Sequence, residues 1–457
     1  MLKNSYIRLL ISTFITGLTF SNAIQAAPYE LIDLGTLEGL NTYSFAINNH
    51  NEVTGTADGP VIAAADIDPD NLPAFCSDGS FREFCTHAFL YSDSGMIDLG
   101  DLGVPSSYGL GINDDSTVVG YGTEEVFDAD AVVIANRERA MISFSGGQVE
   151  AIPYPADLDL AELVQPQQRA LDISNDRKVV GFTLFRRFDA DAVSVTLIQP
   201  YVYDYDTDTL SLIPLFSSDI NRGGSARSIN SSGVVVGWGS SEDENNPPHA
   251  FIWDPASPDF SVDIGTLGGF TSESTAINDN GLVVGVSETT TLFATNQKLA
   301  FIYDKSQATP LIALPEFSDN DDLRTSYPND INNSNQVVGT AQFTTATLNG
   351  NTAFLYDHND GSLTNLNDMV DCSLNWELYN ALAINDNGVI TGTGVFDGAS
   401  RSFMLIPTTD TVPTNCTALR KAERDERLDA INEGSGSFGL LSLLLASLVV
   451  WRRRRLK

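Results

Sequence analysis

One short phrase occurs seven times along the chain, and it constrains the fold more than any other feature. Its clearest copy is residues 276–285, and in every copy an Ile is followed eight residues later by a Gly. The pairs are Ile47 and Gly55, Ile112 and Gly120, Ile173 and Gly181, Ile229 and Gly237, Ile277 and Gly285, Ile331 and Gly339, and Ile384 and Gly392. The spacing between copies varies from 48 to 65 residues, so the phrase is a structural unit joined by loops of variable length.

The middle of each phrase has the composition of a turn. Asn follows the Ile in six copies and Ser174 in the remaining one, and both side chains bond to nearby backbone groups in turns. The fourth residue after the Ile is Gly or Asn in five copies, which suits a left-handed backbone. A β-branched residue follows two positions later in all seven copies. The phrase therefore predicts a β-hairpin, and its final Gly predicts a bulge or a close backbone approach.

Each hairpin is followed by two more strand-like runs, for example residues 250–253 and 210–213. Four-stranded units repeated seven times predict an all-β fold, a seven-bladed β-propeller of four-stranded antiparallel blades. The last unit lacks a fourth strand, whereas residues 29–35 form a spare strand of that type. We therefore expect the amino-terminal strand to complete the last blade and close the propeller. An open solenoid or a sandwich is the alternative.

The amino-terminal end carries a targeting signal. Lys3 and Arg8 precede or enter a short apolar stretch, and small residues stand before Pro28. This pattern predicts a secretory signal peptide over residues 1–26. A membrane-anchoring helix is the alternative, although the apolar run is short for one.

Residues 28–407 hold the seven units without a break in composition and are expected to form one domain. Residues 408–433 are rich in charge and have the character of a solvated stalk. Residues 434–457 combine small residues, an apolar run and four consecutive arginines, which favours a sorting or transmembrane signal with a cytoplasmic basic end. The protein is therefore expected to be exported.

Loop length points to one face of the predicted propeller. The turns within the hairpins are constant, whereas the loops between second and third strands and between units are long. Both kinds of long loop emerge on the same face of an up-and-down blade, and repeat proteins usually bind there. The candidate binding residues in two of these loops are Trp376, Glu377, Tyr379, Asp319, Asp321 and Arg324. Packing of the loop is the favoured interpretation of Trp376, Glu377 and Tyr379, and part of a sugar platform is the alternative.

The chain contains four cysteines, and an exported protein meets an oxidising environment. Cys76 and Cys85 lie in one long loop and are predicted to form a disulfide. Cys372 lies in the last loop between units and Cys416 after the final strand, so a bond between them would tie the carboxyl end to the domain. A metal site is the alternative, but neither Cys-x-x-Cys spacing nor a nearby His cluster supports it.

The formal net charge is −35, and without the seven positive charges of the two removable ends it is about −42. Such a surface repels nucleic acid and anionic lipid. Its simplest interpretation is solubility, and binding of Ca²⁺ is the alternative because Asp-rich loops such as residues 66–70 offer oxygen ligands. No loop fits the twelve-residue helix–loop–helix pattern.

The sequence contains no recognisable catalytic motif. Its four histidines do not stand beside a Ser or Cys nucleophile in any local pattern, and the acids are too numerous for a carboxylate pair to be chosen. The favoured function is a secreted or surface-displayed module that binds or scaffolds through the long-loop face. The rival hypotheses are an extracellular polysaccharide hydrolase or lyase with carboxylates at the channel mouth, and a structural matrix or adhesion protein.

Two resemblances add to these inferences. Residues 434–457 resemble the GlyGly-type carboxyl-terminal sorting signal of Gram-negative bacteria, although Gly-Ser-Gly replaces the adjacent glycine pair. That resemblance implies cleavage by a rhomboid-like protease and export by type II secretion. It thus implies a location at the cell surface or outside the cell after transient anchoring in the inner membrane by the carboxyl-terminal tail. Residues 87–91, 249–253 and 263–269 resemble the HAF repeat of bacterial extracellular proteins. That resemblance implies an extracellular location and a repeat fold, and it implies no particular activity.

Overall fold

The computed structural model describes residues 29–63, 67, 74–76, 81–127, 133–155, 164–188, 194–216, 223–241, 247–289, 298–307, 309–315, 325–345 and 348–408. Within these residues the fold is all-β, with two short 3-10 helices, η1 (Leu366–Asp368) and η2 (Cys372–Leu374). Neither of these helices has the length and apolar character needed to span a membrane. The predicted signal peptide, the charged stalk and the carboxyl-terminal signal lie outside the described residues.

The strands pair in sequence order into antiparallel units. The first unit is β2 (Thr42–Ile47), β3 (Val53–Asp58), β6 (Thr86–Ser92) and β7 (Gly95–Asp98). The second is β8 (Val104–Ile112), β9 (Thr117–Phe127), β10 (Val133–Phe144) and β11 (Glu150–Ala151). A single parallel pair, Thr86 with Ser106, joins these two units into one eight-stranded sheet. The short hairpin β4 (Ala74–Phe75) and β5 (Phe81–Arg82) lies in the long loop of the first unit.

Four further four-stranded sheets follow in sequence order. The third unit is β12 (Val164–Ile173), β13 (Lys178–Phe188), β14 (Ser194–Asp204) and β15 (Thr209–Leu212). The fourth is β16 (Gly224–Ile229), β17 (Val235–Ser240), β18 (Pro248–Trp253) and β19 (Val262–Asp263). The fifth is β20 (Gly268–Ile277), β21 (Val283–Thr289), β22 (Lys298–Tyr303) and β23 (Leu311–Ala313). The sixth is β24 (Thr325–Ile331), β25 (Gln336–Thr345), β26 (Leu348–Asp357) and β27 (Ser362–Asn365).

The last sheet combines the two ends of the described chain. Its order is β1 (Tyr29–Asp33), β30 (Ala399–Pro407), β29 (Ile390–Phe396) and β28 (Glu377–Ile384). β1 runs antiparallel to β30, with Tyr29 opposite Pro407 and Asp33 opposite Phe403. The predicted pairing of the amino-terminal strand with the last unit is therefore present.

The seven repeated phrases form the seven first hairpins, β2–β3 through β28–β29. The fourth residue after each Ile has a positive φ in all seven turns, from 56° at Ser116 to 79° at Gly281. This group also includes Arg177, at φ 62°, which the composition of the turn alone did not favour. The turn prediction is thus confirmed at every copy, because the hairpin geometry requires a left-handed residue whichever side chain stands there.

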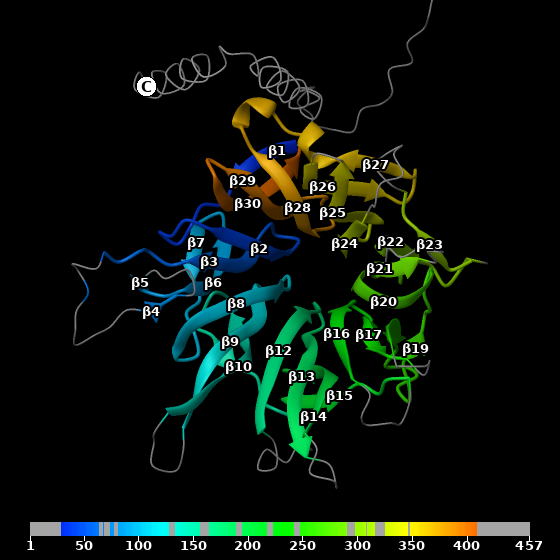
Figure 1. The fold of residues 1–457 in the computed structure, drawn as a ribbon, viewed down its shortest axis with the longest axis horizontal. Coiled ribbons are helices and arrows are strands. Elements are labelled where there is room, and N and C mark those ends of the chain that lie inside the picture. Colours follow the sequence, from blue (N-terminus) through cyan, green and yellow to red (C-terminus); the bar gives the residue numbers. More distant parts are fainter. Residues whose placement is uncertain are drawn as a thin grey trace, which may run out of the picture.

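Neighbouring units pack face to face through buried apolar clusters. The third strands place Phe89, Phe251, Phe301, Phe354 and Phe403 at equivalent positions, and all five are 2 % exposed or less. Burying a Phe side chain is worth about 2–3 kcal/mol, so this position anchors each sheet. Figure 1 shows the sheets side by side around a central region, with the first strand of each unit innermost. Val389 and Met404 of the last sheet share a cluster with Val53 and Phe89 of the first.

Candidate functional site

Each first hairpin contains a β-bulge at the same place. The register shifts by one residue just before the phrase, for example between Ser44 and Ala46 and between Ser274 and Ala276. The residue skipped in each unit has no partner on the second strand. These bulge residues are Phe45, Leu110, Leu171, Arg227, Thr275, Asn329 and Leu382. A bulge re-aims the skipped side chain away from the alternating faces of the strand.

The final Gly of each phrase lies close to the bulge. A Cβ added to Gly285 would stand 2.2 Å from the carbonyl oxygen of Glu273, and one added to Gly120 would stand 1.8 Å from that of Tyr108. The other five glycines of the phrase have the same conflict with the opposite strand, at 2.0 or 2.1 Å. The predicted close approach is confirmed, and it explains why the sequence keeps a Gly at this position in every unit.

The seven bulge residues line one cavity, which we call the central cavity, with a volume of about 260 Å³. In the order of the sheets, Leu382, Phe45, Leu110 and Leu171 form an apolar arc. Arg227, Thr275 and Asn329 form a polar arc. The cavity therefore offers an apolar wall facing a wall that can donate and accept hydrogen bonds.

The polar arc is tied to neighbouring strands. The Arg227 guanidinium lies 3.8 Å from a carboxylate oxygen of Glu273, and both side chains are about 40 % exposed. Thr275 Oγ1 donates to the carbonyl oxygen of Pro328 at 2.8 Å, and Asn329 Nδ2 donates to that of Ala381 at 2.7 Å. An exposed pair as long as that of Arg227 is weak, so Arg227 is the member of the arc most available to a ligand.

Two carboxyl groups line the same cavity. Asp172 accepts from the backbone N–H of Ile173 at 2.8 Å and of Ile229 at 3.0 Å. Asp330 accepts from those of Ile331 and Ile384 at 2.8 and 2.9 Å. Burial raises the pKa of each to about 6, although the backbone hydrogen bonds act in the opposite direction. Both groups can therefore hold a proton near neutral pH.

The hairpin turns form a second hollow of about 160 Å³, lined by the Ile residues of the phrases and, except for Asn113, by the two residues that follow each of them. Asn side chains link successive turns. Asn230 Nδ2 donates to the carbonyl oxygen of Asn278, Asn278 to Asn332, and Asn332 to Asn385, at 2.9–3.2 Å. Asn385 Nδ2 donates to Asn48 at 2.9 Å, so the last turn bonds to the first.

The series of turns continues from Asn48 to Asn113 and from Asn113 to Ser174. It has one gap. Ser174 replaces Asn and carries no amide to reach the next turn at Asn230, and no bond between these two turns is found among the described residues. Across this gap the Asp172 carboxylate bonds to Ile229 instead.

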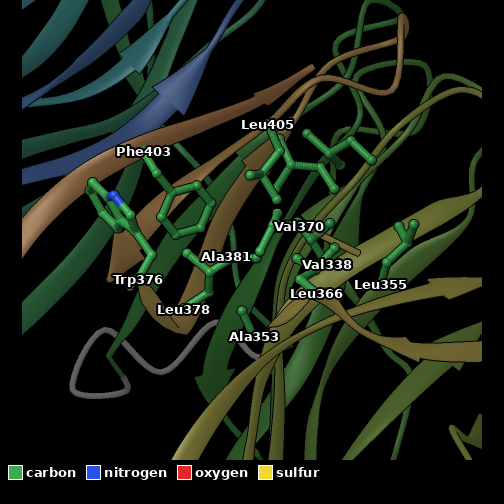
Figure 2. Packing of buried hydrophobic residues seen from close by; sticks show 12 residues of the cluster. Val338, Ala353, Leu355, Leu366, Val370, Trp376, Leu378, Ala381, Phe403 and Leu405 are labelled. Atoms are coloured by element: carbon green, nitrogen blue, oxygen red, sulfur yellow. The ribbon is translucent and has the colours of Figure 1, made fainter. Parts of the chain in front are cut away.

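Trp376, one of the residues proposed for a sugar platform, is a core residue. Its side chain is only 4 % exposed, and it stacks on Phe396 with ring centroids 5.2 Å apart. It also meets Phe403 edge-on, within the cluster drawn in Figure 2. The sugar-platform interpretation of Trp376 is therefore wrong, and the packing interpretation describes it. Its ring fills the space between the loop and the last sheet.

The other predicted binding residues do not form a site with Trp376. Glu377 is exposed and Tyr379 is half-buried. Burial raises the pKa of the Tyr379 hydroxyl, which hydrogen-bonds to Ser400 and Thr393. Asp319, Asp321 and Arg324 lie outside the described residues.

The disulfide between Cys76 and Cys85 is present, and it closes a loop with a sequence separation of 9. Cys416 lies outside the described residues, so its bond to Cys372 stays a prediction. In the part of the chain that the structure describes, no group of three or more His, Cys, Asp or Glu side chains is placed to hold a metal ion.

Comparison with known proteins places the chain in a family. A family model described as "Protein of unknown function (DUF3466)" matches residues 101–264 and 266–404, which is more than half of the chain. The chain belongs to the DUF3466 family. No curated protein matches it.

Solved structures resemble this DUF3466 chain only distantly. An oligogalacturonate lyase in complex with manganese has a TM-score of 0.41 at 10% identity, covering 84% of this chain and 98% of the lyase. A puromycin-hydrolysing peptidase from Mycobacterium tuberculosis has a TM-score of 0.39 at 8% identity, covering 76% of this chain and 57% of the peptidase. An acylaminoacyl peptidase from Pyrococcus horikoshii has a TM-score of 0.38 at 14% identity, covering 69% and 48%. The chain thus matches about half the length of the two peptidases, and likenesses this weak carry no inference about function.

Sequence reasoning missed the bulge residues and the two carboxyl groups of this DUF3466 chain. Asp172 and Asp330 stand immediately before the Ile of their phrases, where other copies have Ala, Gly or Ser. This departure from the repeat is the signal that would have found them. The bulge residues lack such a signal because they share no residue type across the seven copies: three are Leu and the other four are Phe, Arg, Thr and Asn.

Proposed function

We propose that this protein is an exported binding module, a closed seven-bladed β-propeller that takes a small ligand, or the end group of a larger one, into its central cavity. The observation that carries the proposal is the bulge repeated in all seven first hairpins, which brings one side chain per unit to the same cavity. A structural repeat alone needs no such convergence of apolar and polar side chains on one cavity.

Three features support the closed architecture. The amino-terminal strand β1 pairs with β30, the turn at Asn385 bonds to the turn at Asn48, and apolar residues of the last sheet pack against the first. Together they join the two ends of the repeat. The N-terminal strand would then act as the closing strand of the seventh blade.

The lining suits an amphipathic ligand. Apolar groups would lie against the arc of Leu382, Phe45, Leu110 and Leu171, while Arg227 would meet an anionic or hydrogen-bonding group on the opposite wall. A volume of about 260 Å³ lies near the lower end of small-molecule sites. The long-loop face predicted from the sequence remains the proposed outer binding surface.

The proposed setting is the cell surface or the exterior. It rests on the signal peptide over residues 1–26, on the likeness of residues 434–457 to a GlyGly-type sorting signal and on the HAF-like repeat. A rhomboid-like protease and the type II secretion machinery are the partners that this tail implies. The high negative charge suits a soluble exterior and argues against nucleic acid as a partner.

Filling the cavity tests the binding function. The exported protein would be screened by saturation-transfer NMR against soluble mono- and disaccharides and L-amino acids. Leu110→Trp should abolish binding of any hit, whereas Ile312→Trp, a control on the exposed outer strand β23, should leave it unchanged. Binding that survives Leu110→Trp, or that both variants abolish, would refute the assignment to the central cavity.

A second candidate is an extracellular polysaccharide hydrolase or lyase. The observation that favours it is the pair Asp172 and Asp330, both with a pKa near 6 inside the cavity, since an acid of this pKa can exchange a proton with a substrate. Against it, both oxygens of each group already accept backbone N–H groups. Glycan turnover by wild type that disappears in Asp330→Asn would favour the enzyme. Turnover by none of the proteins would favour the binding module.

A further inference from the structure

A second feature recurs in the units, a pair of polar side chains that links the third strand to the fourth. His87 Nδ1 lies 2.9 Å from Asp98, and His249 Nδ1 lies 2.8 Å from Asp263. In the last sheet Arg401 lies 3.0 Å from Asp33, with β1 supplying the fourth strand. In the sixth unit Thr352 Oγ1 donates to Asn365 Oδ1 at 2.9 Å. Four units thus place complementary groups at equivalent positions.

The strand register confirms that the positions are equivalent in all seven units. In the first unit, Asp98 lies opposite Phe89, which stands two places after His87 in the chain. The same offset relates the third-strand and fourth-strand members in every other unit. The third-strand partners are His87, Arg139, Gln199, His249, Leu299, Thr352 and Arg401. The matching fourth-strand residues are Asp98, Ala151, Leu212, Asp263, Ala313, Asn365 and Asp33.

Four of the seven third-strand residues are basic, and Arg139 is the one of these four whose matching fourth-strand residue is not an acid. The uncharged Gln199 of the third unit also matches an apolar residue, Leu212. Where the fifth unit lacks the acid, having Ala313, its third strand lacks a polar residue too, having Leu299. The second unit keeps a cation, Arg139, although its matching fourth-strand residue is Ala151. Arg139 forms no salt bridge with any residue that the structure describes, and its buried Nε has no hydrogen-bond partner there.

Aromatic and polar groups surround this guanidinium. Its central carbon lies 3.6 Å from the centre of the Tyr154 ring, and that of Arg137 lies 5.3 Å from the same ring. The Glu124 carboxylate also attracts Arg139, but it forms its salt bridge with Arg137, at 2.5 Å. It therefore does not serve as a direct partner of Arg139. A half-buried charge held mainly by a ring face lacks the carboxylate that a guanidinium prefers.

Buried oxygens without partners lie on the strands of the third unit beside Tyr154, whose hydroxyl donates to the carbonyl oxygen of Pro166. Gln168 donates from Nε2 to the carbonyl oxygen of Pro153, beside Tyr154, but its Oε1 has no partner in the described chain. Thr183, opposite Gln168 across β12 and β13, also has a hydroxyl without a partner there. Buried polar atoms are normally satisfied, and a ligand hydroxyl that reached the Gln168 side chain would satisfy its Oε1.

We propose that Arg139 and Tyr154 form a binding site for the carboxylate of a hydroxylated acid, and that the ligand class is a uronic-acid residue of a saccharide. The carboxylate would take the place of the acid that Ala151 lacks, and the sugar hydroxyls would lie toward Gln168. Tyr154 stands next to the long loop that follows β11, and Arg139 lies in the middle of β10. The site is separate from the central cavity and does not depend on a ligand there.

The variant Ala151→Asp tests the proposal, because it restores the acid that other units have at this position. By analogy with Asp98, Asp263 and Asp33, the new carboxylate should pair with Arg139 and occupy the site from within. The probe is trigalacturonate, with neutral maltotriose and a triglutamate peptide as comparisons, titrated by calorimetry into the exported protein. Wild type should bind trigalacturonate at least tenfold more tightly than either comparison. Ala151→Asp should weaken that binding at least tenfold while raising the melting temperature.

Arg139→Gln should also weaken trigalacturonate binding at least tenfold. The matched control, Arg401→Gln, removes a cation at the same repeat position that already has its acid, and it should lower the melting temperature without changing the affinity. No binding by wild type, equal binding of maltotriose, or affinity unchanged in Ala151→Asp would each overturn the proposal. Preference for the glutamate peptide would overturn the sugar class. Trigalacturonate binding should be unchanged in Leu110→Trp, and its loss there would place the ligand in the central cavity and overturn the proposal, whereas loss of a central-cavity ligand alone in that variant would not affect it.

Discussion

The hydrogen bonds between hairpin turns can be tested by removing one of them and by adding one. Asn332 is 3 % exposed, and its Nδ2 donates to the carbonyl oxygen of Asn385 at 3.0 Å. Its Oδ1 accepts from the N–H groups of Ser334 and Gln336. Asn332→Ser should therefore lose the bond to the next turn and weaken the bonds within its own turn. Ser174→Asn should instead add the bond that is missing toward Asn230.

The magnitudes follow from the bonds that remain. The Asn385 carbonyl oxygen also accepts from Gly388 N–H at 3.0 Å, so Asn332→Ser does not leave it without a partner. One net hydrogen bond is worth about 1 kcal/mol, so Asn332→Ser should lower the free energy of unfolding by about 1–2 kcal/mol. Ser174→Asn should raise it by about 1 kcal/mol.

Guanidinium unfolding followed by tryptophan fluorescence measures both changes as shifts of the midpoint. Asn136→Ser is the control, because Asn136 is exposed on β10, and a change there should stay within about 0.5 kcal/mol. If Ser174→Asn adds no stability while Asn332→Ser removes none, the turn-to-turn bonds do not hold the units together, and the reasoning fails.

Three further predictions concern a glycine, a carboxyl group and a disulfide. Gly285→Ala should cost about 3 kcal/mol or more in thermal unfolding, since its Cβ would stand 2.2 Å from a carbonyl oxygen, whereas Gly281→Ala, in open space at φ 79°, should cost about 1–2 kcal/mol. The folded-state pKa of Asp330 is raised to about 6, so its effect on stability is most favourable below its unfolded pKa and declines as pH rises to about 6. The free energy of unfolding of Asp330→Asn, measured relative to wild type in denaturant titrations, should therefore increase by about 1–2 kcal/mol between pH 4 and pH 7.5. This value allows for partial exposure of the carboxyl group in the cavity. An unchanged difference would contradict the assigned pKa. Peptide mapping of the non-reduced protein should find Cys372 linked to Cys416, and free thiols at both positions would refute that bond.

The local backbone of this protein follows from its sequence. Gly233, Gly281 and Gly388 mark left-handed positions, and Gly285 marks a strand that another backbone approaches. These features depend on residues within one hairpin, where φ preference and Cβ size decide the outcome. The pairing of β1 with β30 was also predictable, because the last unit visibly lacks one strand.

Contacts between units were not predictable in the same way. The Asn after each Ile was interpreted as a turn former, and its Oδ1 does cap the turn, but its Nδ2 reaches the next hairpin. Trp376 is an aromatic residue in a long loop and could have served as a binding platform, yet tertiary packing buries it against Phe396. Phe45 and Arg227 reach the central cavity because a bulge redirects them, and nothing in the alternation of the strand reveals where a bulge re-aims a side chain.

Closure of the chain on itself is the central claim, and one engineered disulfide tests it most directly. Glu30 of β1 lies opposite Ile406 of β30, so the double variant Glu30→Cys, Ile406→Cys brings two thiols together only if the amino-terminal strand completes the last sheet. After mild oxidation of the folded protein, peptide mapping should find residues 30 and 406 linked in most molecules. If both thiols stay free while the protein is folded, the two ends of the repeat are not joined, and the shared central cavity has no basis.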